Sequence, residues 1–204
     1  GQHNWKTLLE NDPIEKVHEF KLGDTFSLAY TSGSTGKPKG VVLSHGNLSA
    51  AASTAVNLMG VRNQDHLMSY LPLAHITERA LIENVSFYSG CKVFFVESLD
   101  TFIDDVKIAQ PHLFISVPRL WNKFQIEILN KIPDIKLQKL LKIPFVGKLV
   151  AKKIRKGLGF NQARCFGSGT APISPSTLEW YDGLGIPISE GWGMTETSGL
   201  SCSN

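Results

Sequence analysis

Short apolar runs alternate with longer amphipathic stretches along the chain, and a glycine, a proline or a capping residue stands at each junction. This alternation is typical of repeated strand–helix units. The runs predicted as strands cover residues 26–30, 41–43, 66–71, 92–96, 113–117, 163–166 and 186–188. The stretches predicted as helices cover residues 47–59, 75–88, 102–110 and 175–181, with a further helix carrying apolar residues at 120, 124 and 128.

Parallel strands joined by helical crossovers predict an α/β fold with a doubly wound, mostly parallel sheet and helices on both faces. Ser44 is predicted to cap the helix over 47–59, and Gly60 to end it in the left-handed conformation. No proline-rich or serine/glycine-rich linker divides the chain, so it is treated as one domain or a part of one.

The composition is that of a folded globular chain: 42% of the 204 residues are hydrophobic and 19% are charged. This balance excludes disorder as the main state. A net charge of +3 is too close to neutrality to indicate a nucleic-acid or membrane partner by itself. The three cysteines form no C-x-x-C pair, and no apolar run is long enough to span a bilayer. We therefore expect a cytoplasmic protein without a disulfide framework or zinc ribbon.

Positive charge is concentrated in residues 136–156, which hold seven lysines and one arginine and no acid. Leucine, isoleucine, valine and phenylalanine are interleaved with these cations, so the segment is amphipathic. It can lie peripherally on an anionic membrane surface, or it can be a solvated basic helix face. Phe145 is its one aromatic residue, so base stacking has little support and no nucleic-acid partner is expected.

The loop 31–40 between two predicted strands has three glycines, four hydroxyl side chains and two lysines. Such a hairpin loop can fold its N–H and hydroxyl groups around a polyphosphate, while Lys37 and Lys39 neutralise charge. A Walker A loop is excluded, since Gly33 and Gly36 are only three residues apart. Every G-x-G in the chain lacks the third glycine of the dinucleotide fingerprint, which argues against a hydride-transferring oxidoreductase. A flexible surface loop is the alternative for residues 31–40.

Four more loops are expected to meet at one edge of the sheet, because ligands of open α/β sheets bind beyond the carboxyl ends of the strands. They are residues 72–75, 116–119, 167–172 and 190–197.

The residues of these loops carry a family resemblance. Residues 30–40, 70–75, 167–172 and 191–197 resemble, in order and spacing, the core motifs of the AMP-forming acyl-CoA synthetase and ligase superfamily. Residues 71–79 and 116–121 are similar to the long-chain fatty acyl-CoA synthetase branch. The resemblance covers nearly all of the chain from Asp24 onward.

The resemblance implies ATP-dependent activation of a fatty acid to an acyl-adenylate, followed by transfer of the acyl group to coenzyme A. It implies Mg²⁺, with Thr31 and Glu196 near the metal, Thr195 on the α-phosphate, Lys39 beside the phosphates and His75 beside the carboxylate. The implied phosphate-binding residues are Thr31, Ser32, Gly33, Ser34, Thr35, Gly36 and Lys37. The implied nucleotide-binding residues are Gly169, Thr170, Ala171, Glu190, Gly191, Trp192, Gly193, Met194 and Thr195.

Two positions depart from the family pattern. Trp192 stands where a tyrosine is commoner, and Glu190 stands where an amide is common. Trp192 is expected to stack on adenine, with ordinary core packing as its alternative. His75 outside its motif would more often cap a helix than contact a ligand.

The superfamily resemblance also implies a longer protein. Residues 1–204 are expected to be a fragment of the AMP-binding amino-terminal domain, without the carboxy-terminal domain that carries a catalytic lysine. The fragment is expected not to form acyl-CoA alone. The alternative is a nucleotide- or membrane-surface-binding fragment without turnover.

Overall fold

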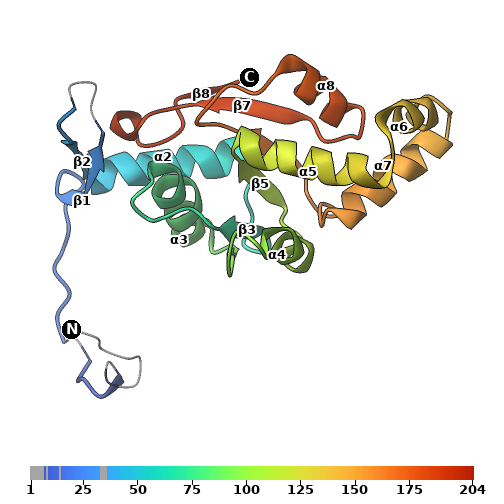
Figure 1. Cartoon of the computed structure of the whole chain (residues 1–204). Helices are drawn as coiled ribbons and strands as arrows, with labels where there is room; N and C mark the ends of the chain where they lie inside the picture. The colour runs from blue at the N-terminus through green and yellow to red at the C-terminus, as the bar shows by residue number, and fades with distance from the viewer. Residues whose placement is uncertain (1–6, 8, 14, 33–35) are drawn as a thin grey trace.

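The computed structural model describes residues 7, 9–13, 15–32 and 36–204 (Figure 1). Strands and helices alternate along most of the described chain. The strands are β1 (Thr25–Thr31), β2 (Lys39–Ser44), β3 (His66–Ser69), β4 (Lys92–Phe95), β5 (Leu113–Ser116), β6 (Cys165–Ser168), β7 (Ile188–Trp192) and β8 (Cys202–Ser203). The helical elements are α2 (His45–Met59), η1 (Glu78–Asn84), α3 (Val85–Ser89), α4 (Phe102–Ala109), α5 (Pro118–Lys131), α6 (Asp134–Leu141), α7 (Val146–Gly157), α8 (Pro175–Asp182) and η2 (Thr195–Thr197).

The strands are mostly parallel, as predicted. β5, β6 and β7 pair in parallel, and the short β8 adds to β7 in the antiparallel direction. β3 and β4 form a second parallel pair. The backbone N–H of His112, next to β5, donates to the carbonyl of His66 in β3 at 3.0 Å, so the two parallel groups adjoin. The antiparallel hairpin β1–β2 stands at one end of the molecule (Figure 1).

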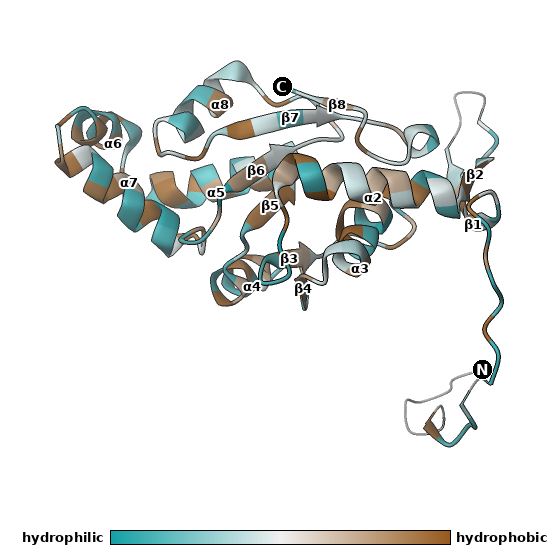
Figure 2. Ribbon diagram, turned by 180° about the vertical axis from the view of Figure 1, so that it is seen from behind, coloured by the Kyte–Doolittle hydropathy of each residue, from teal (hydrophilic) through white to brown (hydrophobic). Residues whose placement is uncertain are grey.

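Helices cover both faces of the parallel strands. Neighbouring residues of a strand point to opposite sides, and apolar residues on both sides are buried against helices. One side of the strands packs on α2, η1 and α3, and the other side packs on α4, α5 and α8. The residues facing the first group are Leu67, Leu113 and Cys165. Their chain neighbours Met68, Phe114 and Phe166 enter the larger, aromatic core on the other side. The predicted doubly wound arrangement is therefore confirmed. In Figure 2 helices α4, α5 and α7 carry both brown apolar and teal polar residues, as helices that cover a sheet do.

Helix α2 begins and ends where the sequence predicts. The Ser44 hydroxyl accepts from the Asn47 N–H at 3.1 Å, and the Asn47 side chain accepts from the Ser44 N–H at 3.0 Å. This reciprocal pair satisfies two amide groups that the first helical turn leaves without partners. Gly60 follows the helix with φ of 60°, the left-handed conformation that glycine adopts at low cost.

The predicted bounds of β6 and β7 are wrong by two to four residues. Both strands extend further along the chain, so residues 167–168 and 190–192 lie within strands, where the sequence predicts loop. Ladder pairing with neighbouring strands overrides the low strand propensity of the glycines there. The helix predicted over 75–88 is a π-helical stretch, η1, that continues into α3.

Candidate functional site

A cleft of about 570 Å³ opens at the carboxyl ends of β5, β6 and β7. The parallel ladders pair Ser116 with Ser168 and Ser168 with Glu190, so β5 and β6 end at one level and β7 continues two residues further. This is the edge where the sequence predicts a ligand site. The predicted motifs contribute Tyr70, His75, Ser116, Gly169, Thr170, Gly191, Trp192, Gly193, Met194 and Thr195 to the lining.

The remaining wall of the cleft is largely apolar. It comes from the end of α2, from η1, from the middle of β5 and from the turn before β8. Its residues include Leu58, Met59, Ile76, Leu81, Ile115 and Leu200. The cleft therefore has a polar, glycine-rich side and an apolar side, as a ligand with a charged head and a hydrocarbon part requires.

Tyr70 fixes one side of the cleft. Its hydroxyl lies 3.1 Å from the carbonyl of Ile115 and 3.3 Å from the Ser116 hydroxyl, and it can donate to either. Burial raises the pKa of Tyr70 to about 12, and the charge of Glu78 acts in the same direction. Tyr70 therefore stays a protonated donor at neutral pH and ties the loop after β3 to β5.

Glu190 holds the loop that follows β6. Its carboxylate accepts a hydrogen bond from the backbone N–H of Ile173 at 3.1 Å. This bond joins β7 to the end of the 167–172 motif, in which Thr170 has a φ of 70°. Glu190, an acid where the family more often has an amide, thus has a hydrogen-bond partner within the chain, the N–H of Ile173. The assignment of Glu190 to the adenine site stays a prediction.

Ser168 carries the one buried side-chain polar atom without a hydrogen-bond partner among the described residues. The residue is 2% exposed and lines the cleft at the end of β6. A buried hydroxyl without a partner costs free energy, so it is an available donor or acceptor for a bound polar group.

Glycines shape the turn that carries Thr195 and Glu196. A Cβ on Gly193 would overlap the carbonyl of Gly199, and a Cβ on Gly191 would lie 2.8 Å from the side chain of Leu200. The chain can therefore fold back on itself here, and the N–H of Gly199 donates to the carbonyl of Met194 at 3.0 Å.

Thr197 anchors the same turn through its hydroxyl. That oxygen accepts from the Met194 N–H at 3.0 Å and from the Ser201 hydroxyl at 2.7 Å. Within the described residues, the hydrogen bonds that hold the turn thus use Thr197 rather than the exposed Glu196.

His75 lines the cleft just before η1. Its Nδ1 lies 3.2 Å from the backbone N–H of Thr77 and accepts from it. In a neutral imidazole this assigns the proton to Nε2, which leaves an N–H donor on the ring. The side chain of the nearby buried Glu78 accepts from the Leu71 N–H at 3.2 Å and so fixes the loop between them.

The β1–β2 hairpin stands beside the cleft and adds no residue to its lining as described. Thr31 pairs with Lys39 at the base of its loop, and β2 contacts η2. The hairpin is thus adjacent to the turn that carries Glu196. Ser32, Gly36 and Lys37 are exposed, and the predicted phosphate-binding residues Gly33, Ser34 and Thr35 lie outside the described residues.

The predicted site residues thus fall into two neighbouring groups. The cleft brings together His75, Gly169, Thr170, Gly191, Trp192, Gly193, Met194 and Thr195. The residues beside it, which do not line it, are Thr31, Ser32, Gly36, Lys37, Lys39, Ala171, Glu190 and Glu196. Ser116 and Ser168 lie in these motifs and line the cleft, but the sequence predicts no role for either. The apolar wall carries no motif that could have identified it.

The fold is that of the amino-terminal domain of adenylate-forming enzymes, and comparison with known proteins shows the family. The AMP-binding enzyme family matches residues 2–204, so the chain belongs to that family. It is 32% identical to the long-chain-fatty-acid–CoA ligase ACSBG2 of Gallus gallus, over 98% of this chain and 31% of that protein. It is 37% identical to the peroxisomal long chain acyl-CoA synthetase 7 of Arabidopsis thaliana, over 89% of this chain and 29% of that protein.

Solved structures show the same fold. ATP-bound MatB from Rhodopseudomonas palustris superposes with a TM-score of 0.71 at 25% identity, over 98% of this chain and 35% of that one. The chain spans between 28% and 36% of the length of the curated relatives compared with it.

Proposed function

We propose that residues 1–204 form the ATP-binding part of the amino-terminal domain of an AMP-forming fatty acid–CoA ligase. In this reaction the fatty acid carboxylate attacks the α-phosphorus of ATP and releases pyrophosphate. The thiol of coenzyme A then attacks the acyl-adenylate and releases AMP. The observation that carries the proposal is the cleft itself, where the 167–172 and 191–197 motifs meet His75 beside an apolar wall. The printed names of the two relatives above support the fatty acid as substrate.

The first step joins two negatively charged reactants, so the site must offset their repulsion. Lys37 and Lys39 of the hairpin loop supply positive charge beside the cleft. Thr195, on the cleft wall, has a hydroxyl that can donate to the α-phosphate. The Nε2–H of His75 can donate a hydrogen bond to the carboxylate or to the adenylate that replaces it.

Thr31 and Glu196 fit a magnesium ion, because both offer oxygen ligands. Thr31 pairs with Lys39 of β2, and β2 contacts η2, which carries Glu196. The described residues contain no group of three or more histidines, cysteines or acids that could hold a metal. That is compatible with Mg²⁺, which keeps several waters and binds substrate phosphates rather than a full protein cage. A bound ion would neutralise phosphate charge at this point of the cleft.

The polar side of the cleft suits the nucleotide. Gly169 and Thr170 leave room for a base to approach the backbone, and the ring of Trp192, which is 57% exposed, is open to stacking. The unpartnered hydroxyl of Ser168 would gain a hydrogen bond from a bound polar group. The apolar wall, from Met59 to Leu200, would hold the hydrocarbon chain of the acid.

We also propose peripheral contact with an anionic membrane through residues 136–156, from which a lipid substrate could be taken. The charge of this segment supports the contact. No described helix is long and apolar enough to cross a bilayer. The cysteines are unpaired, which fits the reducing, cytoplasmic setting predicted from the sequence.

The test is pyrophosphate release by the complete protein, measured with carboxylic acids of graded chain length. We expect ATP-dependent release of pyrophosphate that rises with acyl length, and an acyl-CoA product when coenzyme A is present. Release that is independent of a carboxylic acid would contradict it. The same assay on residues 1–204 alone tests the nucleotide-binding alternative. That alternative predicts that the fragment binds ATP but releases no pyrophosphate.

A further inference from the structure

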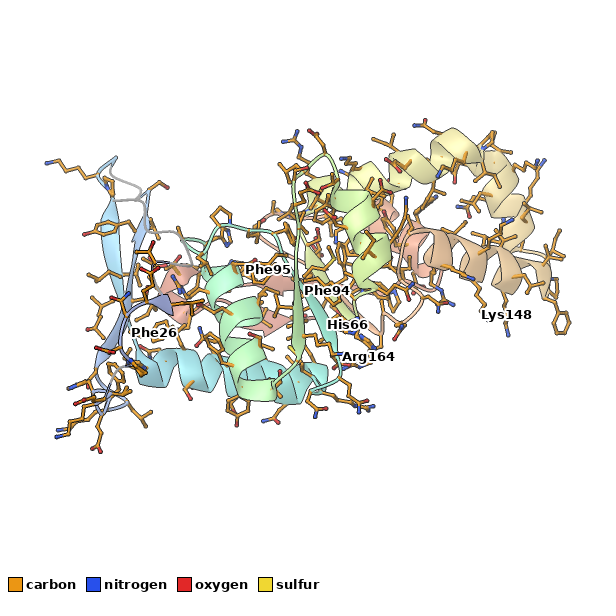
Figure 3. The ribbon with its side chains drawn as sticks, turned by 90° about the horizontal axis from the view of Figure 1, so that it is seen from below. Phe26, His66, Phe94, Phe95, Lys148 and Arg164 are labelled. Atoms are coloured by element: carbon orange, nitrogen blue, oxygen red, sulfur yellow. The ribbon has the colours of Figure 1, made fainter. Side chains whose placement is uncertain are left out.

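Helices α6 and α7 form a hairpin at the end of the molecule opposite the β1–β2 hairpin (Figure 1). Their connection exposes apolar side chains. Phe145 is 82% exposed, and Ile143 and Leu149 are exposed on either side of it. Lys148, three residues after Phe145, is labelled at the right of Figure 3, at this end of the molecule.

The backbone holds Phe145 in an unusual conformation. Its φ is 64° and its ψ is −46°, and the N–H of Val146 donates to the carbonyl of Pro144 at 2.7 Å. This is a γ-turn with positive φ, which is rare for a residue with a side chain. Gly147 permits the turn, because a Cβ there would overlap the carbonyl of Leu141. Such strained positions concentrate at functional sites.

Most other apolar residues of the segment are used by the fold. Leu137 is fully buried in the larger core, and Leu141, Val150 and Ile154 pack against it. The whole apolar face of residues 136–156 is therefore not available to a membrane. What remains exposed is a small apolar tip, defined here as Ile143, Phe145, Val146 and Leu149.

Exposed lysines lie along both helices that flank this tip. Lys136, Lys139, Lys142, Lys148, Lys152, Lys153 and Lys156 are all exposed. None of these seven forms an ion pair within the described part of the chain. Arg155 differs from these lysines because its side chain has a partner within the protein. Its guanidinium donates a hydrogen bond to the carbonyl of Gly185 at 3.0 Å. The hairpin end thus presents uncompensated positive charge around an apolar centre.

We infer that Phe145 and its apolar neighbours insert into the acyl layer of an anionic membrane while the surrounding lysines bind lipid phosphates. The inference rests on the membrane contact proposed above and names the element that makes it. Charge complementarity selects an anionic lipid surface as the partner, because helices α6 and α7 and their connection carry seven exposed lysines and residues 136–156 contain no acid. Transfer of one phenylalanine side chain from water contributes about tenfold or more in affinity, and each lysine near the surface contributes about fivefold.

The experiment is cosedimentation of the complete protein with vesicles of phosphatidylcholine alone or mixed with phosphatidylglycerol. Phe145→Ala should weaken binding to the anionic vesicles about tenfold, at low and at high salt alike. Phe95→Ala is the matched control, because Phe95 is 81% exposed and lies in β4, away from Lys148 (Figure 3). It should bind as the wild type does. Leu149→Gln, within helix α7, should weaken binding without altering the γ-turn.

A variant with Lys142→Gln, Lys148→Gln and Lys152→Gln should also lose binding, but its loss should shrink as salt rises. If this variant loses binding while Phe145→Ala and Leu149→Gln keep it, the contact is electrostatic and the insertion of the tip is refuted. Equal losses in Phe145→Ala and Phe95→Ala refute it as well. If the wild type does not bind anionic vesicles at low salt, the proposed membrane contact itself is wrong. Equal binding to neutral vesicles excludes the anionic partner.

Discussion

Arg164 donates hydrogen bonds to both carboxylate oxygens of Asp65, at 2.9 Å from Nη1 to Oδ1 and 2.5 Å from Nη2 to Oδ2. The two residues are 99 positions apart, and Arg164 also donates to the carbonyl of Gly60 at 2.7 Å. The pair therefore ties the start of β6 to the turn before β3, near His66 in Figure 3. Burial acts to raise the pKa of Asp65, but the hydrogen bonds from Arg164 and from the Arg62 backbone outweigh it and lower the pKa.

Replacing Arg164 by methionine should lower the free energy of unfolding by about 3 kcal/mol at pH 7. The cost is that of leaving the nearly buried Asp65 carboxylate without its partner. Because the pKa of Asp65 is lowered by folding, its contribution to stability is present above the unfolded value near 4 and is lost as pH falls through the folded value. Urea denaturation at pH 7 and pH 3 measures both effects. A loss that is as large at pH 3 as at pH 7 contradicts this account.

Ser168→Ala should leave the free energy of unfolding unchanged or slightly higher, because it removes a buried hydroxyl that has no partner. Affinity for ATP should fall severalfold, since the ligand loses a hydrogen bond. Ser116→Ala is the matched control for stability. Ser116 is 3% exposed and its hydroxyl is within reach of the Tyr70 hydroxyl, so its loss should cost about 1 kcal/mol. Denaturation and calorimetric titration with ATP separate the two outcomes.

Gly193→Ala should destabilise the protein by about 1 to 3 kcal/mol and weaken ATP binding, because the new Cβ overlaps the Gly199 carbonyl and displaces the turn that carries Glu196. Gly157→Ala serves as control, since no atom lies within 4 Å of a Cβ there. ATP affinity of the control should match the wild type. Wild-type affinity in Gly193→Ala would show that the turn does not contribute to the nucleotide site.

Tyr70 should make the protein sensitive to alkali. Folding raises its pKa to about 12 from a usual value near 10, so its contribution to stability is complete below pH 10 and is lost as pH rises through 12. The free energy of unfolding should fall by roughly 2 to 3 kcal/mol across that range because of this group. Tyr70→Phe should remove that part of the dependence, and Tyr88→Phe, at an exposed position, should keep it. Stability measured from pH 9 to pH 12 provides the comparison.

The sequence predicts the layers of the fold well because they depend on local patterns. Successive residues of each strand enter two different cores, as Leu113 and Phe114 do. This alternation follows directly from the order of residues in the sequence. The limits of α2 follow from Ser44 and Gly60 by the same logic. The edge where the motif loops meet follows from the parallel connection of the strands.

Other features depend on partners far along the chain and could not be predicted. The bond from Ile173 to Glu190 and the unpartnered hydroxyl of Ser168 exist only in the folded arrangement. In residues 136–156, the amphipathic pattern indicates an apolar face. It does not predict that Leu137 is buried in the core and that Phe145 is exposed. That division depends on where α6 ends and α7 begins.

Adenylate formation is measured most directly by exchange of labelled pyrophosphate into ATP by the complete protein, in the presence of a long-chain fatty acid. We expect exchange that requires the fatty acid and Mg²⁺, and that falls at least 100-fold in Glu196→Gln, because loss of charge stabilisation at the phosphates costs about 3 kcal/mol or more. Glu179→Gln, at an exposed position in α8, should exchange as the wild type does. Exchange without a fatty acid, or undiminished exchange in Glu196→Gln, would contradict the account.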